Sequence, residues 1–256
     1  MMLLQSKKCC ENFAPAFPQI SFELFFSYIC NGSKLQKIHM RNPLIDEILS
    51  RPEAPQLIEE VKKALCLEKE KREQFYQTIT DQEKAEFING EMIMHSPATW
   101  QHSQIVGRLN QLIKTYVDVN NLGYVGTEKV MIRLTRNDYE PDLIFFKTEK
   151  ANQFKPDQLL FPAPDFIVEV LSKSTENRDR GVKFNDYAAH QVPEYWLVDP
   201  DAKSVEQYLL QEQSYHLQVK LMSGMIQSEQ IQGLKFEVEA LFDDQVNLQE
   251  LQKIIR

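Results

Sequence analysis

Two acidic residues stand inside otherwise apolar segments of the chain. Glu169 lies in FIVEVL, where every neighbour is hydrophobic, and Asp142 follows Pro141 and precedes Leu-Ile-Phe-Phe. A buried carboxylate is costly unless a cation compensates it, so a salt bridge explains Glu169 alone as well as a metal site does. Two such residues on neighbouring strands, which lie about 4.8 Å apart, favour one shared divalent cation. Mg²⁺ held by a few carboxylates is the usual ion of phosphate chemistry.

A metal ion that activates water also needs a positive group to orient that water and to stabilise the charge of a pentacovalent phosphate. Lys183 is the first candidate, because it lies fourteen residues after Glu169, on a helix that is expected to pack back over the sheet. Lys173, near the end of the Glu169 segment, is the alternative. A lysine taken at random is more often a solvated surface charge. A third acidic candidate is Glu91, directly after an Asn-Gly pair.

The elements that must position these residues indicate a mixed α/β domain. EFINGEMIM, residues 86–94, has two short apolar runs around Asn-Gly and predicts a type I′ hairpin. Apolar residues at helical spacing predict an amphipathic helix over 99–118, and further helices are expected at 178–190 and 247–255. Strands are predicted at 124–134, 142–146, 166–171, 195–199, 204–210 and 215–221. This order predicts a mixed β-sheet flanked by helices.

The N-terminal part of the chain differs from the rest. Residues 1–39 hold three of the four cysteines and a net charge of +2, and we expect this extension to be absent from a native protein that starts at Met40. Residues 40–80 predict a helical segment with two helices, and residues 81–256 the main domain. The apolar run at 20–30 is shorter than the roughly 20 residues of a membrane span, so no membrane partner is expected. Cysteines without a CxxC pair are typical of a cytoplasmic protein.

The net charge of −8 argues against a protein that wraps a polyanion. Residues 99–136 nevertheless carry five basic side chains against two acids, a local excess of three positive charges. Such a patch predicts weak or transient contact with nucleic-acid phosphates.

Three segments carry a more specific signal: NGEMIMHSPATWQHSQIVGRL, EPDLIFF, and PDFIVEVLSKSTENRDRGVKFNDYAAHQVPEYWLVDPDAKSVEQYLL. Together they resemble the Uma-two group of restriction-endonuclease-like proteins, within the PD-(D/E)XK nuclease superfamily, from about residue 83 to 245. The resemblance implies a restriction-endonuclease-like three-layer core and a metal-dependent endonuclease that hydrolyses phosphodiester bonds of DNA. It assigns Asp142 and Glu169 to Mg²⁺, with Mn²⁺ as the alternative ion, and makes Glu91 a further ligand or proton acceptor.

The resemblance leaves two choices for the lysine. Leu171 stands where the superfamily has its lysine, and the resemblance implies that the following helix supplies it instead, which matches Lys183. Lys173 occupies a position where the group usually has proline, so it stays the alternative catalytic lysine.

The sequence also allows other functions and offers further candidate residues. A nuclease-like module that binds nucleic acid or protein without cutting would have no lysine at the metal, and a small-molecule phosphohydrolase would have a closed pocket. Restriction-like enzymes that cut both strands often act as dimers, so a homodimer is considered beside the DNA substrate. Asp165 lies roughly 13 Å from Glu169 along one strand, too far to share an ion. His102, on the amphipathic helix, could approach the site, although an isolated helix histidine is more often a surface or capping residue.

Overall fold

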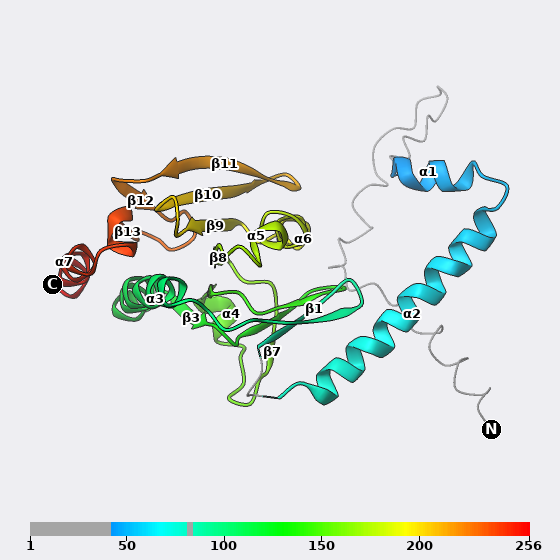
Figure 1. The fold of residues 1–256 in the computed structure, drawn as a ribbon, viewed down its shortest axis with the longest axis horizontal. Helices are drawn as coiled ribbons and strands as arrows, with labels where there is room; N and C mark the ends of the chain where they lie inside the picture. Colours follow the sequence, from blue (N-terminus) through cyan, green and yellow to red (C-terminus); the bar gives the residue numbers. More distant parts are fainter. Residues whose placement is uncertain (1–41, 81–83) are drawn as a thin grey trace, which may run out of the picture. The chain divides into compact units, whose positions relative to one another are not determined.

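The computed structural model describes residues 42–80 and 84–256 (Figure 1). It divides into two compact units, Met1–Gln74 and Phe75–Arg256. The expected extension at residues 1–39 lies outside the described residues. No helix in the described part of the chain is long and apolar enough to cross a lipid bilayer.

The first unit holds the two helices that its sequence predicts. Helix α1 spans Pro43–Leu49, and α2 spans Ala54–Thr78, so that its last residues belong to the second unit. The side chain of Asn42 caps α1 by accepting a hydrogen bond of 3.0 Å from the backbone N–H of Leu44. Proline at the first helical position suits such a start, because its missing N–H has no partner there in any case.

The second unit contains all the described strands. They are β1 (Ala85–Ile88), β2 (Glu91–Met94), β3 (Gly123–Thr127), β4 (Met131–Arg133), β5 (Asp138–Tyr139), β6 (Leu143–Lys147), β7 (Leu160–Phe161), β8 (Phe166–Val170), β9 (Glu194–Asp199), β10 (Ser204–Gln211), β11 (Ser214–Leu221), β12 (Met225–Gln227) and β13 (Lys235–Glu237). A six-stranded sheet has the order β11-β10-β9-β8-β6-β3, and a five-stranded sheet the order β2-β1-β5-β4-β7. The six-stranded sheet is mixed, because β8 and β9 run parallel whereas its other neighbours are antiparallel.

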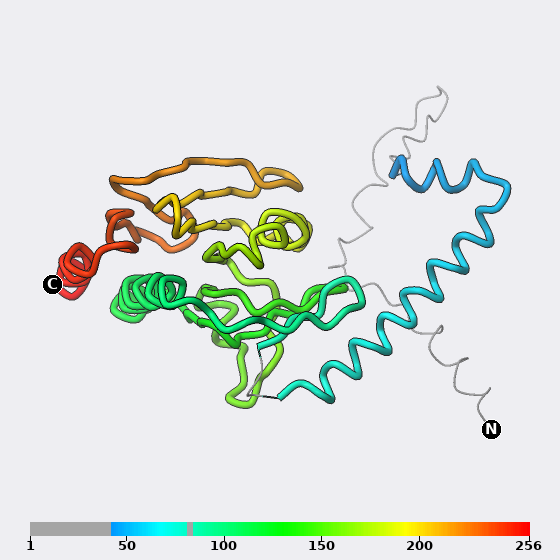
Figure 2. Tube along the Cα trace, in the orientation of Figure 1, coloured from blue at the N-terminus to red at the C-terminus, as the bar shows by residue number. Residues whose placement is uncertain are grey.

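Two apolar cores cover the two faces of the six-stranded sheet. The helices involved are α3 (Trp100–Asn120), α4 (Thr148–Ala151), α5 (Glu176–Asp179), α6 (Val182–Ala189) and α7 (Asp244–Ile255), with a short 3-10 helix η2 (Val238–Leu241). One core joins α3 to alternate residues of β6, β8 and β9, and α7 packs beside α3 (Figure 2). The other core joins α6 and the five-stranded sheet to the remaining residues of the same strands. Strand alternation thus sends each side chain of β8 to one core or the other.

The predicted hairpin and amphipathic helix are confirmed. Asn89 and Gly90 both have positive φ, 50° and 83°, as a type I′ turn requires. The predicted strand 124–134 is wrong as one element, because Glu128 at φ 62° ends β3 and the chain passes to β4 in the other sheet. The predicted helix 178–190 is split at Gly181 into α5 and α6.

Candidate metal centre

Three carboxylates lie in a row at the ends of adjacent strands. The antiparallel register of β6 with β8 places Asp142, just before β6, opposite Glu169 in β8. On the other side of β6, the backbone N–H of Glu128 donates to the carbonyl oxygen of Asp142 over 3.2 Å, directly after the end of β3. The expectation that the Asp142 and Glu169 strands are neighbours is therefore confirmed. Asp142 lies between the other two acidic residues.

Asp142 is buried and surrounded by hydrogen-bond donors. Its Oδ2 accepts from the backbone N–H of Val170 at 2.8 Å. Its Oδ1 lies 3.3 Å from Nε2 of His102 and 3.3 Å from Nζ of Lys84. Burial alone would raise the pKa of Asp142, but the His102 ring, the Lys84 ammonium and the Val170 N–H outweigh burial and hold that pKa well below its usual range. The carboxylate is therefore ionised and ready to bind a cation.

Asp142 belongs to a group of three residues with the donor set of a metal site. One ligand atom each from His102, Glu128 and Asp142 lies within 4.8 Å of the other two. The first turn of α3 supplies His102, whose backbone N–H donates to the side chain of Thr99 over 3.2 Å. The Lys84 ammonium lies 3.4 Å from Glu128 and 3.3 Å from Asp142, so a positive charge already sits against two of the three ligands. An imidazole and two carboxylates fit a divalent cation.

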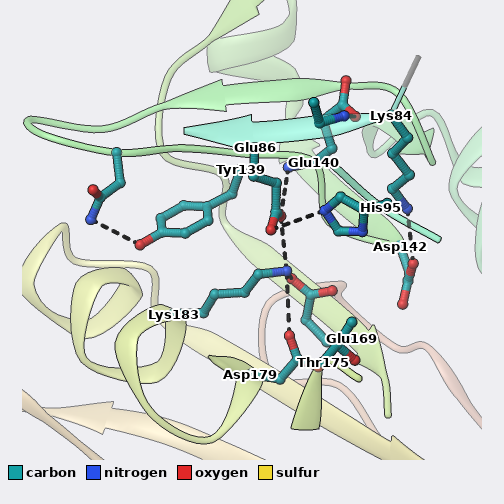
Figure 3. A network of polar contacts seen from close by, with 12 residues as sticks. Lys84, Glu86, His95, Tyr139, Glu140, Asp142, Glu169, Thr175, Asp179 and Lys183 are labelled. Carbon is teal, nitrogen blue, oxygen red and sulfur yellow. Dashed lines mark hydrogen bonds and ion pairs between the residues drawn. The ribbon is translucent and has the colours of Figure 1, made fainter. Parts of the chain in front are cut away.

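A second cluster surrounds the ammonium of Lys183, which is only 1% exposed (Figure 3). Its Nζ lies 2.9 Å from Glu169, 2.9 Å from Glu86 and 3.3 Å from Asp179. The Tyr187 hydroxyl donates to the same Glu169 oxygen over 2.9 Å. The pKa of Glu169 is raised, because burial and the neighbouring carboxylates outweigh the Lys183 charge. One lysine thus compensates three buried carboxylates.

The residues around Asp142, together with Glu169 and Lys183 of the second cluster, line one cavity of about 510 Å³, which also reaches Glu140 and Arg178. Burial raises the pKa of Glu140 to about 7, although Lys84 opposes the shift. The Nε of Arg178 is buried and has no hydrogen-bond partner within the described part of the chain. The cavity is therefore lined by both carboxylates and basic side chains.

The structure brings together three of the four residues that the sequence singled out. Asp142, Glu169 and Lys183 line the cavity, whereas Glu91 is exposed at the start of β2 and does not line it. The reason is that β2 is the edge strand of its sheet, and most of its residues face outward. The acidic residue that the hairpin contributes is Glu86, on the fully buried β1.

The alternative lysine lies elsewhere. Lys173 is exposed in the segment between β8 and α5, and it does not line the cavity. Asp165, which the sequence places too far from Glu169 to share an ion, does not line the cavity. It forms an ion pair of 2.9 Å with Lys150 and accepts a hydrogen bond of 2.8 Å from the backbone N–H of Lys147.

Four residues of the centre were not found from the sequence. Glu86 carries the signal that revealed Glu169, a charge inside the apolar run AEFI. For His102 the sequence favours a surface or capping position over an approach to the site, but the residue is half-buried and contacts Asp142. Glu128 was hidden inside a strand predicted to be continuous, and Lys84 carries no pattern that marks it.

This mixed sheet flanked by helices is a restriction-endonuclease-like fold. The chain belongs to the Uma2 family, described as "Putative restriction endonuclease", whose model matches residues 72–239. Family membership supports a nuclease-like function.

Proteins similar to this chain include two from Synechocystis and one of known structure from Anabaena variabilis. The uncharacterised proteins sll1609 and slr1290 of Synechocystis are 29% and 30% identical to it, over 49% of this chain and over 72% and 66% of their own lengths. A crystal structure at 1.96 Å resolution, titled as that of "a putative nuclease belonging to DUF820" from Anabaena variabilis, has a TM-score of 0.58 at 18% identity. The match covers 66% of this chain and 96% of the Anabaena chain, and it shows that the two proteins share a fold.

Proposed function

We propose that the protein is a metal-dependent endonuclease that hydrolyses phosphodiester bonds of DNA, with Mg²⁺ as its ordinary ion and Mn²⁺ as the alternative. The main support is the row of carboxylates around Asp142, which lines the same cavity as Lys84 and Lys183. Membership of the Uma2 family supports the same function. Ionised Asp142 and the neighbouring Glu169, at the ends of adjacent strands, would hold the ion. The pKa of Glu169 is raised in the protein without an ion, and a bound cation would favour its ionised form. A bound divalent cation supplies Lewis-acid activation of water and offsets the charge of the phosphate.

The two lysines have different surroundings and therefore different roles. Lys183 has a side chain that is 2% exposed and contacts three carboxylates, so it positions Glu169 and has little freedom to reach a substrate. Lys84 has a side chain that is 20% exposed, and its ammonium contacts Asp142. We assign Lys84 to the contact with the phosphate that is cleaved.

Arg178 gives the cavity a second group for phosphate binding. Its buried Nε is unpaired among the described residues, and a guanidinium forms paired hydrogen bonds with phosphate oxygens. Two basic residues of the patch predicted at 99–136 are less suited, because Arg108 forms an ion pair of 2.6 Å with Asp244 and Lys114 one of 2.9 Å with Asp118. Phosphate recognition is therefore expected mainly at the cavity.

Binding without cleavage remains the second candidate, since Lys183 is fully occupied by carboxylates. The contact of Lys84 with Asp142 favours hydrolysis over binding alone, because it supplies the lysine near the metal ligands that a pure binding module lacks.

The test is nicking of supercoiled plasmid and cleavage of single-stranded DNA with Mg²⁺, with Mn²⁺ and with chelator. Asp142→Asn is the test variant, and Asp165→Asn is its matched control, because Asp165 also follows a proline and is also buried but lies outside the cavity. Cleavage should require metal, vanish in Asp142→Asn and persist in Asp165→Asn. Metal-independent cleavage, or full cleavage by Asp142→Asn, would contradict the proposal. No cleavage by the unaltered protein would favour the binding module.

A further inference from the structure

Three potential ligands reach one point of the cavity from three separate elements. His102 comes from the first turn of α3, Glu128 from the residue after β3, and Asp142 from the residue before β6. One ligand atom of each lies within 4.8 Å of the other two. Glu169, by contrast, has an oxygen held by Lys183 and Tyr187. The three residues therefore form a unit that is distinct from the Lys183 cluster, although both line the same cavity.

The backbone fixes the orientation of each member. Thr99 caps α3 and accepts from the backbone N–H of His102, which sets the first turn from which the imidazole projects. Glu128 adopts a positive φ of 62° and donates its N–H to the carbonyl of Asp142. The hydrogen bond from the Val170 N–H occupies Oδ2 of Asp142, so Oδ1 is the oxygen that faces His102. Binding of one ion by the three donors then requires displacement of the Lys84 ammonium, which lies against two of them.

A positive charge is already attracted to this point. The ammonium of Lys84 lies 3.3 Å from Asp142 and 3.4 Å from Glu128, so it supplies a positive charge where a metal ion would bind. The donor set also limits which ion fits. Mg²⁺ prefers oxygen ligands in a near-ideal octahedron, whereas an imidazole nitrogen suits transition metals. The His102 site is therefore expected to take Mn²⁺, the alternative ion of the proposed function, whereas Mg²⁺ would use the carboxylates of Asp142 and Glu169.

We infer that His102, Glu128 and Asp142 form a three-ligand site for a divalent transition metal of the Mn²⁺ class, with an imidazole nitrogen of His102 bound directly to the ion. The inference rests on the proposed function only for the use of the ion in cleavage. Binding itself follows from the ligands, so it can be measured without any substrate.

Pulsed electron paramagnetic resonance of the Mn²⁺-loaded full-length protein tests the inference, because a coordinated imidazole gives a ¹⁴N modulation. The test variant is His102→Gln. The matched control is His95→Gln, since His95 lines the same cavity but pairs with Glu86 at 3.1 Å. The unaltered protein and His95→Gln should show the modulation, and His102→Gln should lose it.

Titration of free Mn²⁺ supplies the affinity. His102→Gln should weaken binding by at least about tenfold, the lower end of the loss seen when even an outer-shell partner is removed. Glu128→Gln should weaken binding while keeping the modulation, which tests the site even if His102→Gln fails to fold. Absence of Mn²⁺ binding, or bound Mn²⁺ without a ¹⁴N modulation in the unaltered protein, would overturn the inference.

Plasmid cleavage by the same preparations separates the two proposals. Metal-dependent cleavage without the ¹⁴N modulation would overturn the His102 site and leave the endonuclease in place. The modulation without cleavage by any ion would do the reverse.

Discussion

Two buried glutamates of the six-stranded sheet, Glu169 and Glu194, have nearly the same burial but opposite surroundings. They lie on neighbouring parallel strands, β8 and β9, and point to opposite faces of the sheet. Glu169 shares its face with residues of the α6 core, whereas Glu194 shares its face with Trp196 of the α3 core. Glu194 accepts hydrogen bonds of 2.7–3.0 Å from five uncharged donors: the side chains of Trp196, Gln207 and Ser228, and the backbone N–H groups of Glu229 and Gln230.

Glu169 instead depends on a lysine that it shares with two other carboxylates, and it borders a cavity. Both glutamates have a raised pKa, chiefly because of burial. A buried carboxylate alone therefore does not identify a functional site. What marks it is an incomplete set of partners that faces an accessible space.

The largest difference between the two glutamates is expected in cleavage. Glu169→Gln should lower the initial rate of metal-dependent plasmid nicking by roughly 10²–10³, the loss typical of removing one group that stabilises the reacting charge. Glu194→Gln should leave the rate per folded molecule unchanged, because Glu194 lies away from the cavity. Equal losses of nicking rate in both variants would show that loss of any buried glutamate lowers activity, and would contradict a specific role for Glu169.

Stability should show the reverse pattern. Glu194→Gln places an amide against donors that need an acceptor and should lower the free energy of unfolding by roughly 2–3 kcal/mol. Urea unfolding at neutral pH, followed by circular dichroism, measures the change. An unaltered unfolding midpoint for Glu194→Gln would contradict the structural role given to its five hydrogen bonds.

A smaller effect is expected at Lys84, which competes with a metal ion for Asp142 and Glu128. Lys84→Met should tighten Mn²⁺ binding about fivefold, on the order of 1 kcal/mol, while it slows cleavage through the lost phosphate contact. Lys150→Met is the control, because Lys150 pairs with Asp165 outside the cavity. Weaker Mn²⁺ binding by Lys84→Met would mean that the ammonium supports the site and does not compete for it.

The smallest effect concerns Glu206 on β10, a carboxylate with two cations of its own. Burial alone would raise its pKa, but hydrogen bonds from Arg180, Lys220 and Tyr208 outweigh burial and lower the pKa to about 2. The unfolded chain therefore takes up a proton at higher pH than the folded protein does. The stabilisation from Glu206 is complete above the ordinary pKa of 4.5 and is lost as the pH falls toward 2.

Unfolding free energies at pH 6 and pH 3, compared between the unaltered protein and Glu206→Gln, test this sign. The advantage of the unaltered protein should shrink at the lower pH. An advantage that grows on acidification would contradict the assignment.

The sequence reveals a residue of the centre where a local pattern is broken. Asp142 and Glu169 stand out because each is an acidic residue in an otherwise apolar segment, and Lys183 because it lies on the helix that follows the Glu169 strand. The same pattern carries no information about partners, which come from distant segments. Nothing near Glu194 in the chain indicates that Ser228 and Gln207 donate hydrogen bonds to its carboxylate, so its structural role could not be predicted.

The remaining misses have a conformational cause. Glu128 reaches the centre because the chain turns there with a positive φ. Glutamate rarely adopts such a φ, so its sequence gives no sign of the turn. His102 reaches it because the start of α3 is placed over the strand ends, a consequence of tertiary packing. The longer helices and most strands follow from hydrophobic periodicity, which is local, whereas the short helix α4 carries no such pattern.

The central claim is that the residues around Asp142 form a metal centre, and anomalous scattering from a crystal soaked in Mn²⁺ tests it most directly. The strongest anomalous peak should lie within coordination distance of the Asp142 carboxylate and should disappear in crystals of Asp142→Asn. A strongest peak elsewhere, or none beside Asp142 in crystals that bind the ion, would contradict the claim.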